Sequence, residues 1–145
     1  MRKTRDRIRH AISFEVIGLL CVTPLGAWAF GMPILDIGVV GIVGATIATV
    51  WNYVFNLIFD HAMVRFMGDV HKTVKLRVAH AVLFEAGLTL ILVPFVAWYL
   101  GIGLLQAFIM DVAFVLFYLI YTFVFNWVYD LVFPLPKASP DGPAA

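Results

Sequence analysis

Two glutamates lie inside stretches of the sequence that are otherwise apolar. Glu15 and Glu85 each stand five residues past a histidine, His10 or His80. At ~1.5 Å per helical residue, each carboxyl would lie in the first third of a ~30 Å hydrocarbon layer. An acidic group there costs at least ~2.5 kcal/mol, so it usually faces a cavity, a charged partner or an ion path. A carboxyl that feels both desolvation and a nearby cation such as Arg7 could exchange a proton for another cation at physiological pH.

Both glutamates end the same motif. Residues 7–15 read R-x-x-H-A-x-x-F-E, and residues 77–85, which lie 70 positions later, match the same pattern. With no gap, this offset also aligns Pro24 with Pro94, Asn56 with Asn126 and Asp60 with Asp130. Charged and amide residues are rare in this sequence, so their recurrence at matched positions indicates a tandem duplication. Parallel repeats of this kind tend to build a shared site from paired residues at their interface.

The composition is that of an integral membrane protein. Of the 145 residues, 63% are hydrophobic and 13% are charged, and the mean hydropathy is +0.97. Soluble domains are far more polar. Four apolar stretches are long enough to cross ~30 Å of hydrocarbon as helices, and they lie near residues 12–31, 36–59, 82–101 and 107–130. We therefore predict an all-α integral membrane fold with four transmembrane helices.

The basic residues predict how these helices are oriented. Five of the ten Lys and Arg precede the first stretch, four fall between residues 61 and 78, and the two short connections have none. By the positive-inside rule, both termini and the middle loop are cytoplasmic. Two tandem repeats, residues 1–70 and 71–133, then enter the membrane in the same orientation. Residues 134–145 are rich in Pro and small residues and are expected to form a disordered tail.

A row of polar residues follows one face near the cytoplasmic end of the second and fourth stretches. The spacing is four residues, so the members of each row lie above one another on a helix. The rows are Asn52, Asn56 and Asp60 in the first repeat and Thr122, Asn126 and Asp130 in the second. Asn56 and Asn126 lie deeper in the membrane, where an interhelical hydrogen bond is their default role and substrate binding is the alternative.

Asp111 has no acidic counterpart in the first repeat, where Gly41 stands. Eleven residues separate Asp111 from Thr122, so the two lie within ~20° on the same helical face. Asp111 could relay protons from the outside, or it could only cap the fourth helix near the interface. We include it with Glu15 and Glu85 among the candidate residues for proton coupling and substrate binding.

Charged residues and histidines at the cytoplasmic boundary have simpler interpretations. Interfacial ion pairs that fix the helix ends are favoured for Arg7, Arg77, Asp60 and Asp130. The two histidines of the motif, His10 and His80, could protonate near neutral pH. Histidine at a membrane boundary is also often only a polar anchor.

The four tryptophans fit the aromatic belts of a membrane protein. They are Trp28, Trp51, Trp98 and Trp127. Trp51 also lies deep enough in the second stretch to line a cavity, and we include it among the candidate site residues.

The second stretch is also the most suited to close helix contact. Between Gly38 and Ala48, small residues recur at i, i+3 and i+4, which favours close approach of another helix. The fourth stretch has bulky residues instead. Because four helices enclose a drug-sized cation more easily as two chains, we expect a homodimer, and this stripe is a candidate contact.

Nothing in the sequence indicates an enzyme. Cys21, the one cysteine, has no histidine nearby, and His10 and His80 stand singly. No Gly-rich phosphate loop is present. We therefore predict no catalytic residues, no metal, no cofactor and no nucleic-acid partner.

The motifs resemble those of the proteobacterial antimicrobial compound efflux (PACE) transporters, which consist of two tandem bacterial transmembrane pair domains. The resemblance rests on the doubled R-x-x-H-A-x-x-F-E motif and on W-N-x-x-F-N-x-x-F-D at residues 51–60. A degenerate copy of the latter, Y-T-x-x-F-N-x-x-Y-D, occupies residues 121–130. The resemblance spans about residues 7–133. The exchange of Trp-Asn for Tyr-Thr in the copy leaves the equivalence of the two half-sites open.

The resemblance implies a proton-coupled efflux transporter of the bacterial inner membrane. Family members export cationic biocides such as chlorhexidine, and some export short-chain diamines. The acid of the first motif, here Glu15, is linked in the family to proton coupling and drug binding. In this interpretation deprotonated Glu15 binds the cation, aromatic side chains hold its apolar part, and protonation from outside releases it. The alternatives are a proton or cation channel and a structural membrane protein without transport.

Overall fold

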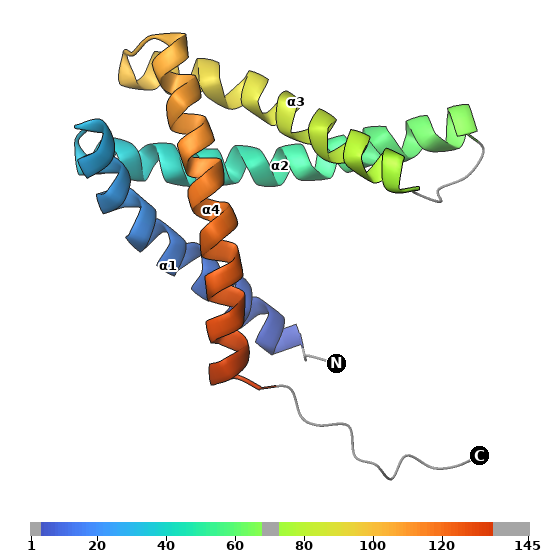
Figure 1. Ribbon diagram of the computed structural model, residues 1–145, viewed down its shortest axis with the longest axis horizontal. Helices are drawn as coiled ribbons and strands as arrows, with labels where there is room; N and C mark the ends of the chain where they lie inside the picture. The colour runs from blue at the N-terminus through green and yellow to red at the C-terminus, as the bar shows by residue number, and fades with distance from the viewer. Residues whose placement is uncertain (1–3, 68–72, 135–145) are drawn as a thin grey trace.

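The computed structural model describes residues 4–67 and 73–134, which form four long helices (Figure 1). They are α1 (Thr4–Phe30), α2 (Ile34–Met67), α3 (Val74–Leu100) and α4 (Leu104–Val132). Each helix is long and apolar enough to cross a membrane. The prediction of an all-α fold with four transmembrane helices is thus confirmed. The expected disordered tail lies, from residue 135 onward, outside the described residues.

All four helices are longer than the apolar stretches that predicted them, and α1, α2 and α3 differ most. α1 and α3 begin at Thr4 and Val74, and α2 continues to Met67. The added turns contain charged and polar residues such as Arg7 and Arg65. Hydropathy detects only the part of a helix that lies in hydrocarbon, whereas Arg, Lys and Met are good helix formers in water as well. The helices therefore extend beyond the predicted spans at the ends where the basic residues gather.

The two short connections are the same turn, once in each repeat. Gly31 and Gly101 have φ of 63° and 65°, the left-handed conformation that commonly ends a helix. The amide of Met32 donates to the carbonyl of Ala27 at 3.2 Å, and the amide of Ile102 makes the matching bond at 3.1 Å. Because the turns are equivalent, both repeats reverse direction in the same way.

We expect Gly101→Ala to lower the stability of the protein by about 1–2 kcal/mol, because a Cβ disfavours the left-handed conformation. Thermal unfolding in detergent measures the effect. Gly103→Ala is the matched control, since Gly103 has a φ of −68° and no atom lies within 4 Å of an added Cβ. Equal losses in the two variants would contradict this account of the turn.

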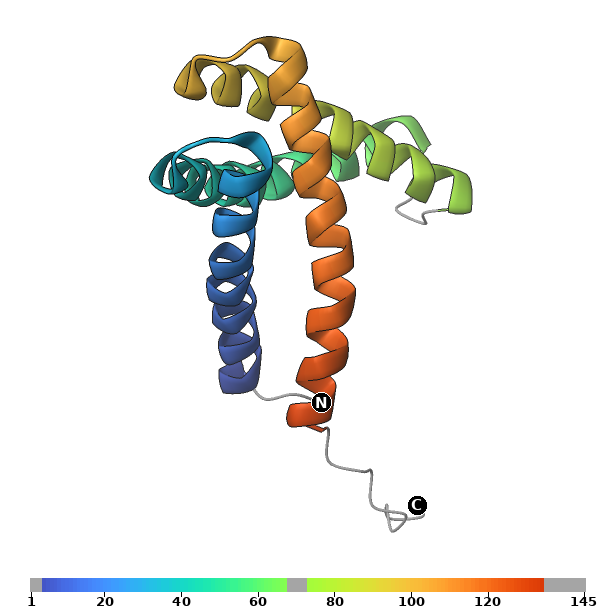
Figure 2. The ribbon, with the colours of Figure 1, turned by 60° about the vertical axis from the view of Figure 1, so that its left-hand side comes forward.

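The four helices form a closed ring. α1 packs against α2 and α4, and α3 packs against α4 and α2, whereas in the described residues the helices across the ring do not touch. At one end, here called the loop end, the connections 31–33 and 101–103 lie near each other (Figure 1). From there α1 and α4 run side by side in one direction, and α2 and α3 in another (Figure 2). We call these pairs the first arm, α1 with α4, and the second arm, α2 with α3.

The main core lies near the loop end and contains only apolar side chains. Six buried residues form this apolar plug: Ile37, Val40, Val93, Val96, Ala107 and Met110. Ile37 and Ala107 occupy matching positions of the two repeats and are both 0% exposed. The outer faces of all four helices present large apolar residues, as expected of surfaces that contact lipid. Thus the ring is sealed near the loop end, and its arms diverge toward the opposite end, here called the terminal end, where α1 and α3 begin and α2 and α4 end (Figure 1).

Candidate substrate cavity

A cavity of about 1090 Å³ lies inside the ring of helices. Val40 and Val96 of the apolar plug line it at the loop end, and Asn126, Trp127 and Asp130 line it toward the terminal end. Its volume is in the range of sites that bind drug-sized molecules. One chain therefore encloses a substantial cavity, although we expected two chains to be needed. The homodimer remains a prediction.

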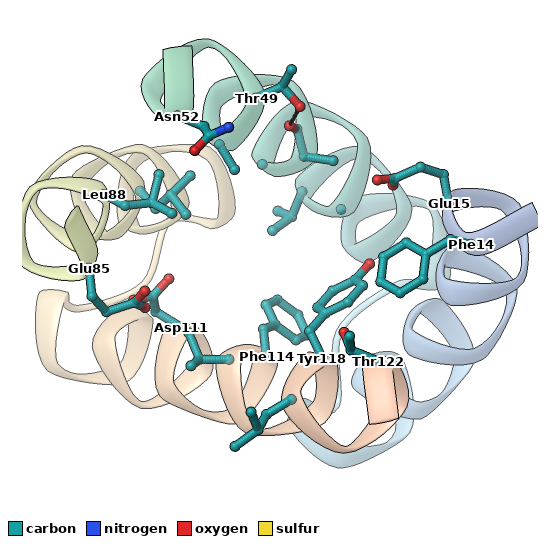
Figure 3. A pocket seen from close by; sticks show the side chains of 18 of the residues that line it. Phe14, Glu15, Thr49, Asn52, Glu85, Leu88, Asp111, Phe114, Tyr118 and Thr122 are labelled. Atoms are coloured by element: carbon teal, nitrogen blue, oxygen red, sulfur yellow. Dashed lines mark hydrogen bonds between the residues drawn. The ribbon is translucent and has the colours of Figure 1, made fainter. Parts of the chain in front are cut away.

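Acidic residues from three helices surround the cavity (Figure 3). Glu15 extends from α1 on one side, and Glu85 of α3 and Asp111 of α4 lie together on the opposite side. Among the described residues that line the cavity there is no Lys or Arg. When deprotonated, these acids give the cavity the charge that attracts cations. A fourth acid, Asp130, lines the cavity toward the terminal end. The sequence analysis singled out all four acids, and the structure brings them to one cavity.

Asp111 is the most deeply placed acid, with 8% of its surface exposed. The hydroxyl of Thr89 on α3 donates to its Oδ2 at 3.0 Å. Asp111 also acts electrostatically on Glu85. The alternative that Asp111 caps α4 is wrong, because the helix begins at Leu104 and its N-cap is Gly103.

The matching place in the first repeat is apolar. Gly41 occupies the position equivalent to Asp111, and Leu19 the position equivalent to Thr89. A Cβ on Gly41 would come within 2.9 Å of Leu19 Cδ2, so Leu19 takes the space that an aspartate would need. The two half-sites therefore differ, with one acid on the first side and two on the other.

The histidines of the motif connect the two repeats. His10 Nε2 lies 2.8 Å from Asn126 Oδ1, and His80 Nε2 lies 3.0 Å from Asn56 Oδ1. Each ring also makes edge contacts with aromatic rings, which are Phe125 and Tyr129 around His10 and Phe55 and Phe59 around His80. The predicted interhelical hydrogen bonds of the two asparagines are confirmed. Each joins the histidine of one repeat to the asparagine of the other, and so holds one arm together.

A second pair of cross-repeat bonds lies nearer the acids. Tyr121 Oη donates to the carbonyl of Phe14 at 2.8 Å, and Trp51 Nε1 donates to the carbonyl of Phe84 at 3.0 Å. Positions 51 and 121 are equivalent, as are 14 and 84. Trp51 is therefore engaged between α2 and α3, outside the residues that line the main cavity. Trp51 lines a smaller pocket of about 280 Å³ between α2 and α3, and Trp127 is the tryptophan that lines the main cavity. A role of Trp51 in substrate binding remains a prediction.

The remaining charged residues of the prediction lie at the terminal end. Arg7, Arg77, Asp60 and Asp130 are exposed, and Asp130 also lines the cavity. Their ion pairing remains a prediction. Arg9, which the sequence analysis left without a role, donates from Nε to Tyr129 Oη at 3.0 Å. It adds a link between α1 and α4 beside the His10 bond.

Tyr118 lines the cavity and was missed in the sequence. A helical argument could have found it, because Tyr118 lies seven residues after Asp111 and four before Thr122. Such spacing places all three on one face of α4. The phenol was overlooked because an aromatic residue in an apolar span normally indicates packing.

The small residues of α2 face the cavity and the neighbouring helices of the same chain. Gly41 approaches Leu19 of α1, and the nearest side chain to Gly44 is Leu92 of α3. Gly41, Gly44, Ala45 and Ala48 all line the cavity. The predicted close packing of α2 is therefore found within one chain. Small side chains at this wall also leave space in the ring.

We expect Gly41→Leu to destabilise the monomer by about 1–3 kcal/mol, the usual cost of overpacking, because the added side chain meets Leu19. It should leave self-association unchanged. Thermal unfolding and native mass spectrometry measure the two effects. Gly44→Ala is the control, since its new Cβ would lie 4.0 Å from the nearest side chain. Loss of dimer without loss of monomer stability would show that this face contacts a second chain.

A membrane protein whose tandem repeats enclose an anionic cavity is built like a small-molecule transporter, and the comparisons with known proteins agree. The sequence model of the chlorhexidine efflux transporter family matches residues 2–65 and 72–135. The chain belongs to this family, the PACE family, and the resemblance seen in its motifs is confirmed. It is therefore a transporter and not an enzyme.

Similar proteins from three bacteria are named short-chain diamines transporter. The Vibrio parahaemolyticus protein is 38% identical over 132 residues, which cover 91% of this chain and 93% of the relative. The Acinetobacter baylyi protein is 36% identical over 129 residues, covering 89% and 90%. The Acinetobacter baumannii protein is 34% identical over 140 residues, covering 94% and 96%. No solved structure matches the chain significantly.

Proposed function

We propose that the protein exports cationic amphipathic biocides of the chlorhexidine type, and short-chain diamines, across the bacterial inner membrane in exchange for protons. The observation that carries the proposal is the cavity between the repeats, which is lined by Glu15, Glu85 and Asp111 and by no Lys or Arg among the described residues. With the termini in the cytoplasm, the diverging arms face inward and the apolar plug faces outward. The described state then receives its substrate from the cytoplasm or the inner leaflet.

Substrate and proton compete for Glu15 in this mechanism. The deprotonated carboxylate attracts the cation, and the rings of Phe14 and Tyr118 beside it contact the apolar part of the substrate. Protonation of Glu15 from the outside removes the attraction and releases the cation. Inward movement of protons therefore drives outward movement of the drug.

The acids on the opposite side suit substrates with two positive charges. Diamines and bisbiguanides both have a cationic group at each end. One end can bind near Glu15 while the other lies near Glu85 and Asp111, across the cavity (Figure 3). Asn52 and Thr122 line the same space with neutral polar groups. A diamine has little apolar surface, so its binding depends more on both acidic sides than that of an amphipathic biocide.

The apolar plug favours a carrier over a channel. A channel needs a continuous polar path, and the six plug residues that close the cavity near the loop end are all apolar. Passage through them would leave an ion without polar partners in hydrocarbon. Counting the protons moved for each substrate molecule tests the distinction, because a carrier gives a fixed ratio and a channel does not.

We expect Glu15→Gln to abolish proton-coupled export without unfolding the protein. The change deletes a titrating group while removing a charge that is costly in the membrane. Transport in proteoliposomes under a pH gradient, together with the melting temperature, measures both effects. Asp6→Asn is the matched control, because Asp6 is an acid on the same helix outside the cavity. Export by Glu15→Gln at the wild-type rate would refute the proposed coupling.

The affinity for a cation should fall as the pH falls. If one proton competes with one cation at Glu15, each pH unit below the pKa of this carboxyl weakens binding about tenfold, or ~1.4 kcal/mol. Glu85→Gln should leave this dependence largely intact if Glu15 alone supplies the coupling, and flatten it if the two acids titrate together. Tryptophan fluorescence at a series of pH values from about pH 5 to pH 8 measures the affinity. A wild-type affinity that is independent of pH would exclude direct competition.

A further inference from the structure

The two cross-repeat bonds nearest the acids end on particular carbonyls. Tyr121 donates to the carbonyl of Phe14, which directly precedes Glu15. Trp51 donates to the carbonyl of Phe84, which directly precedes Glu85. In each case the donor ring and the acid belong to different repeats. A carbonyl oxygen has two lone pairs, so it can accept this bond and still take part in the helical ladder.

Different residues make room for the two rings. On α1, a Cβ at Gly18 would lie 3.2 Å from Tyr121 Cε1. On α3, a Cβ at Gly87 would overlap Trp51 Cζ2. These glycines are not at equivalent positions, because 70 residues after Gly18 stands Leu88. The ring and the location of the glycine both differ between the repeats, whereas the carbonyls that accept the bonds are at equivalent positions.

From this agreement we propose that Tyr121 and Trp51 are positioning residues, each of which fixes the helix segment that holds one cavity carboxylate. Tyr121 positions Glu15 relative to α4, and Trp51 positions Glu85 relative to α2. The inference rests on the proposed role of these acids in binding protons and cations. It also gives the exchange of Trp for Tyr a common role, since each ring donates one hydrogen bond to the equivalent carbonyl.

Polar and ionisable groups of other helices lie around each acid, so we expect a change in its position to change its protonation. Glu15 faces the phenols of Tyr118 and Tyr121 on α4, and the α2 residues that line the cavity beside it are uncharged. Cys21, on the same helix as Glu15, interacts electrostatically with Tyr121. Glu85 faces Asp111 on α4, and α2 presents the neutral Asn52 to the cavity. A small shift of α1 or α3 changes these separations and therefore the protonation midpoint.

The test is the protonation of each acid in protein without substrate. Infrared difference spectra through a pH titration report the carboxyl bands, and Glu15→Gln and Glu85→Gln assign them. We expect Tyr121→Phe, which removes one oxygen and keeps the ring, to shift the midpoint of Glu15 and leave that of Glu85. Trp51→Phe should do the reverse. A shift of about 0.4 pH unit, or about 2.5-fold in proton affinity, corresponds to a typical interhelical hydrogen bond in a membrane protein.

A second variant tests Trp51 without removing its donor group. Gly87→Ala places a Cβ against the Trp51 ring, so it should displace the ring and shift the midpoint of Glu85 as Trp51→Phe does. Gly103→Ala, with nothing near the added Cβ, is the control. Unchanged midpoints in both ring variants would overturn the proposal. So would equal shifts of both acids in each variant, because general loosening of the bundle does not distinguish Glu15 from Glu85.

This outcome is separable from that of the proposed function, because no substrate is present in the titration. If Glu15→Gln still exports while each ring variant shifts only its own acid, the coupling mechanism fails and the positioning role stands. If Glu15→Gln abolishes export but the ring variants shift neither acid, the positioning role fails alone.

Discussion

A polar group inside the hydrocarbon must find a partner or a cavity, and among the described residues most of the partners on another helix come from the other repeat. His10 bonds to Asn126 and His80 to Asn56, while Tyr121 and Trp51 bond to carbonyls across the same two interfaces. These bonds define the arms, each with one helix of either repeat. Glu15 and Glu85 instead face a cavity. The arrangement of the helices therefore follows from where polar groups can be satisfied.

Duplication supplied two equal halves, and a few substitutions made them different. Thr89 and Asp111 form a polar contact at a place where the first repeat has Leu19 and Gly41 in apolar contact. Such a pair must change together, because an aspartate at position 41 would collide with Leu19 and would have no hydroxyl to bind. The asymmetry places Asp111 beside Glu85 and leaves Glu15 without such a neighbour. In the proposed function, this difference would let one carboxylate govern proton exchange while the other side attracts the second charge of a substrate.

The sequence was sufficient to predict the four spans, the tandem repeat and the acids of the cavity, because each depends on a property of single residues or on a fixed offset. It was not sufficient to show how the helices pair. A four-residue spacing places Asn56 on a face of α2, but it does not say which neighbouring helix that face meets. The same limit explains Trp51, whose depth suggested a cavity although its ring is bonded to the backbone of α3. Gly18 and Gly87 could not be picked out either, because each matters only through the aromatic ring of another helix that packs against it.

The kinds of contact in the two regions suggest which parts move during transport. The arms are held by directional hydrogen bonds and by edge-on and tilted contacts between aromatic rings, and these are lost if the partner helices slide. The residues of the apolar plug are held by packing, and the hydrogen bond from Thr89 to Asp111 lies beside them. In a membrane such packing has no hydrophobic driving force, because lipid tails can replace the partner helix. Separating the plug therefore costs less than separating an arm. In the proposed export cycle, the first and second arms rotate against each other. This rotation opens the plug and closes the terminal end, which gives the outward-facing state. Glu15 stays fixed relative to α4, and Glu85 stays fixed relative to α2, because the hydrogen bonds beside them are kept.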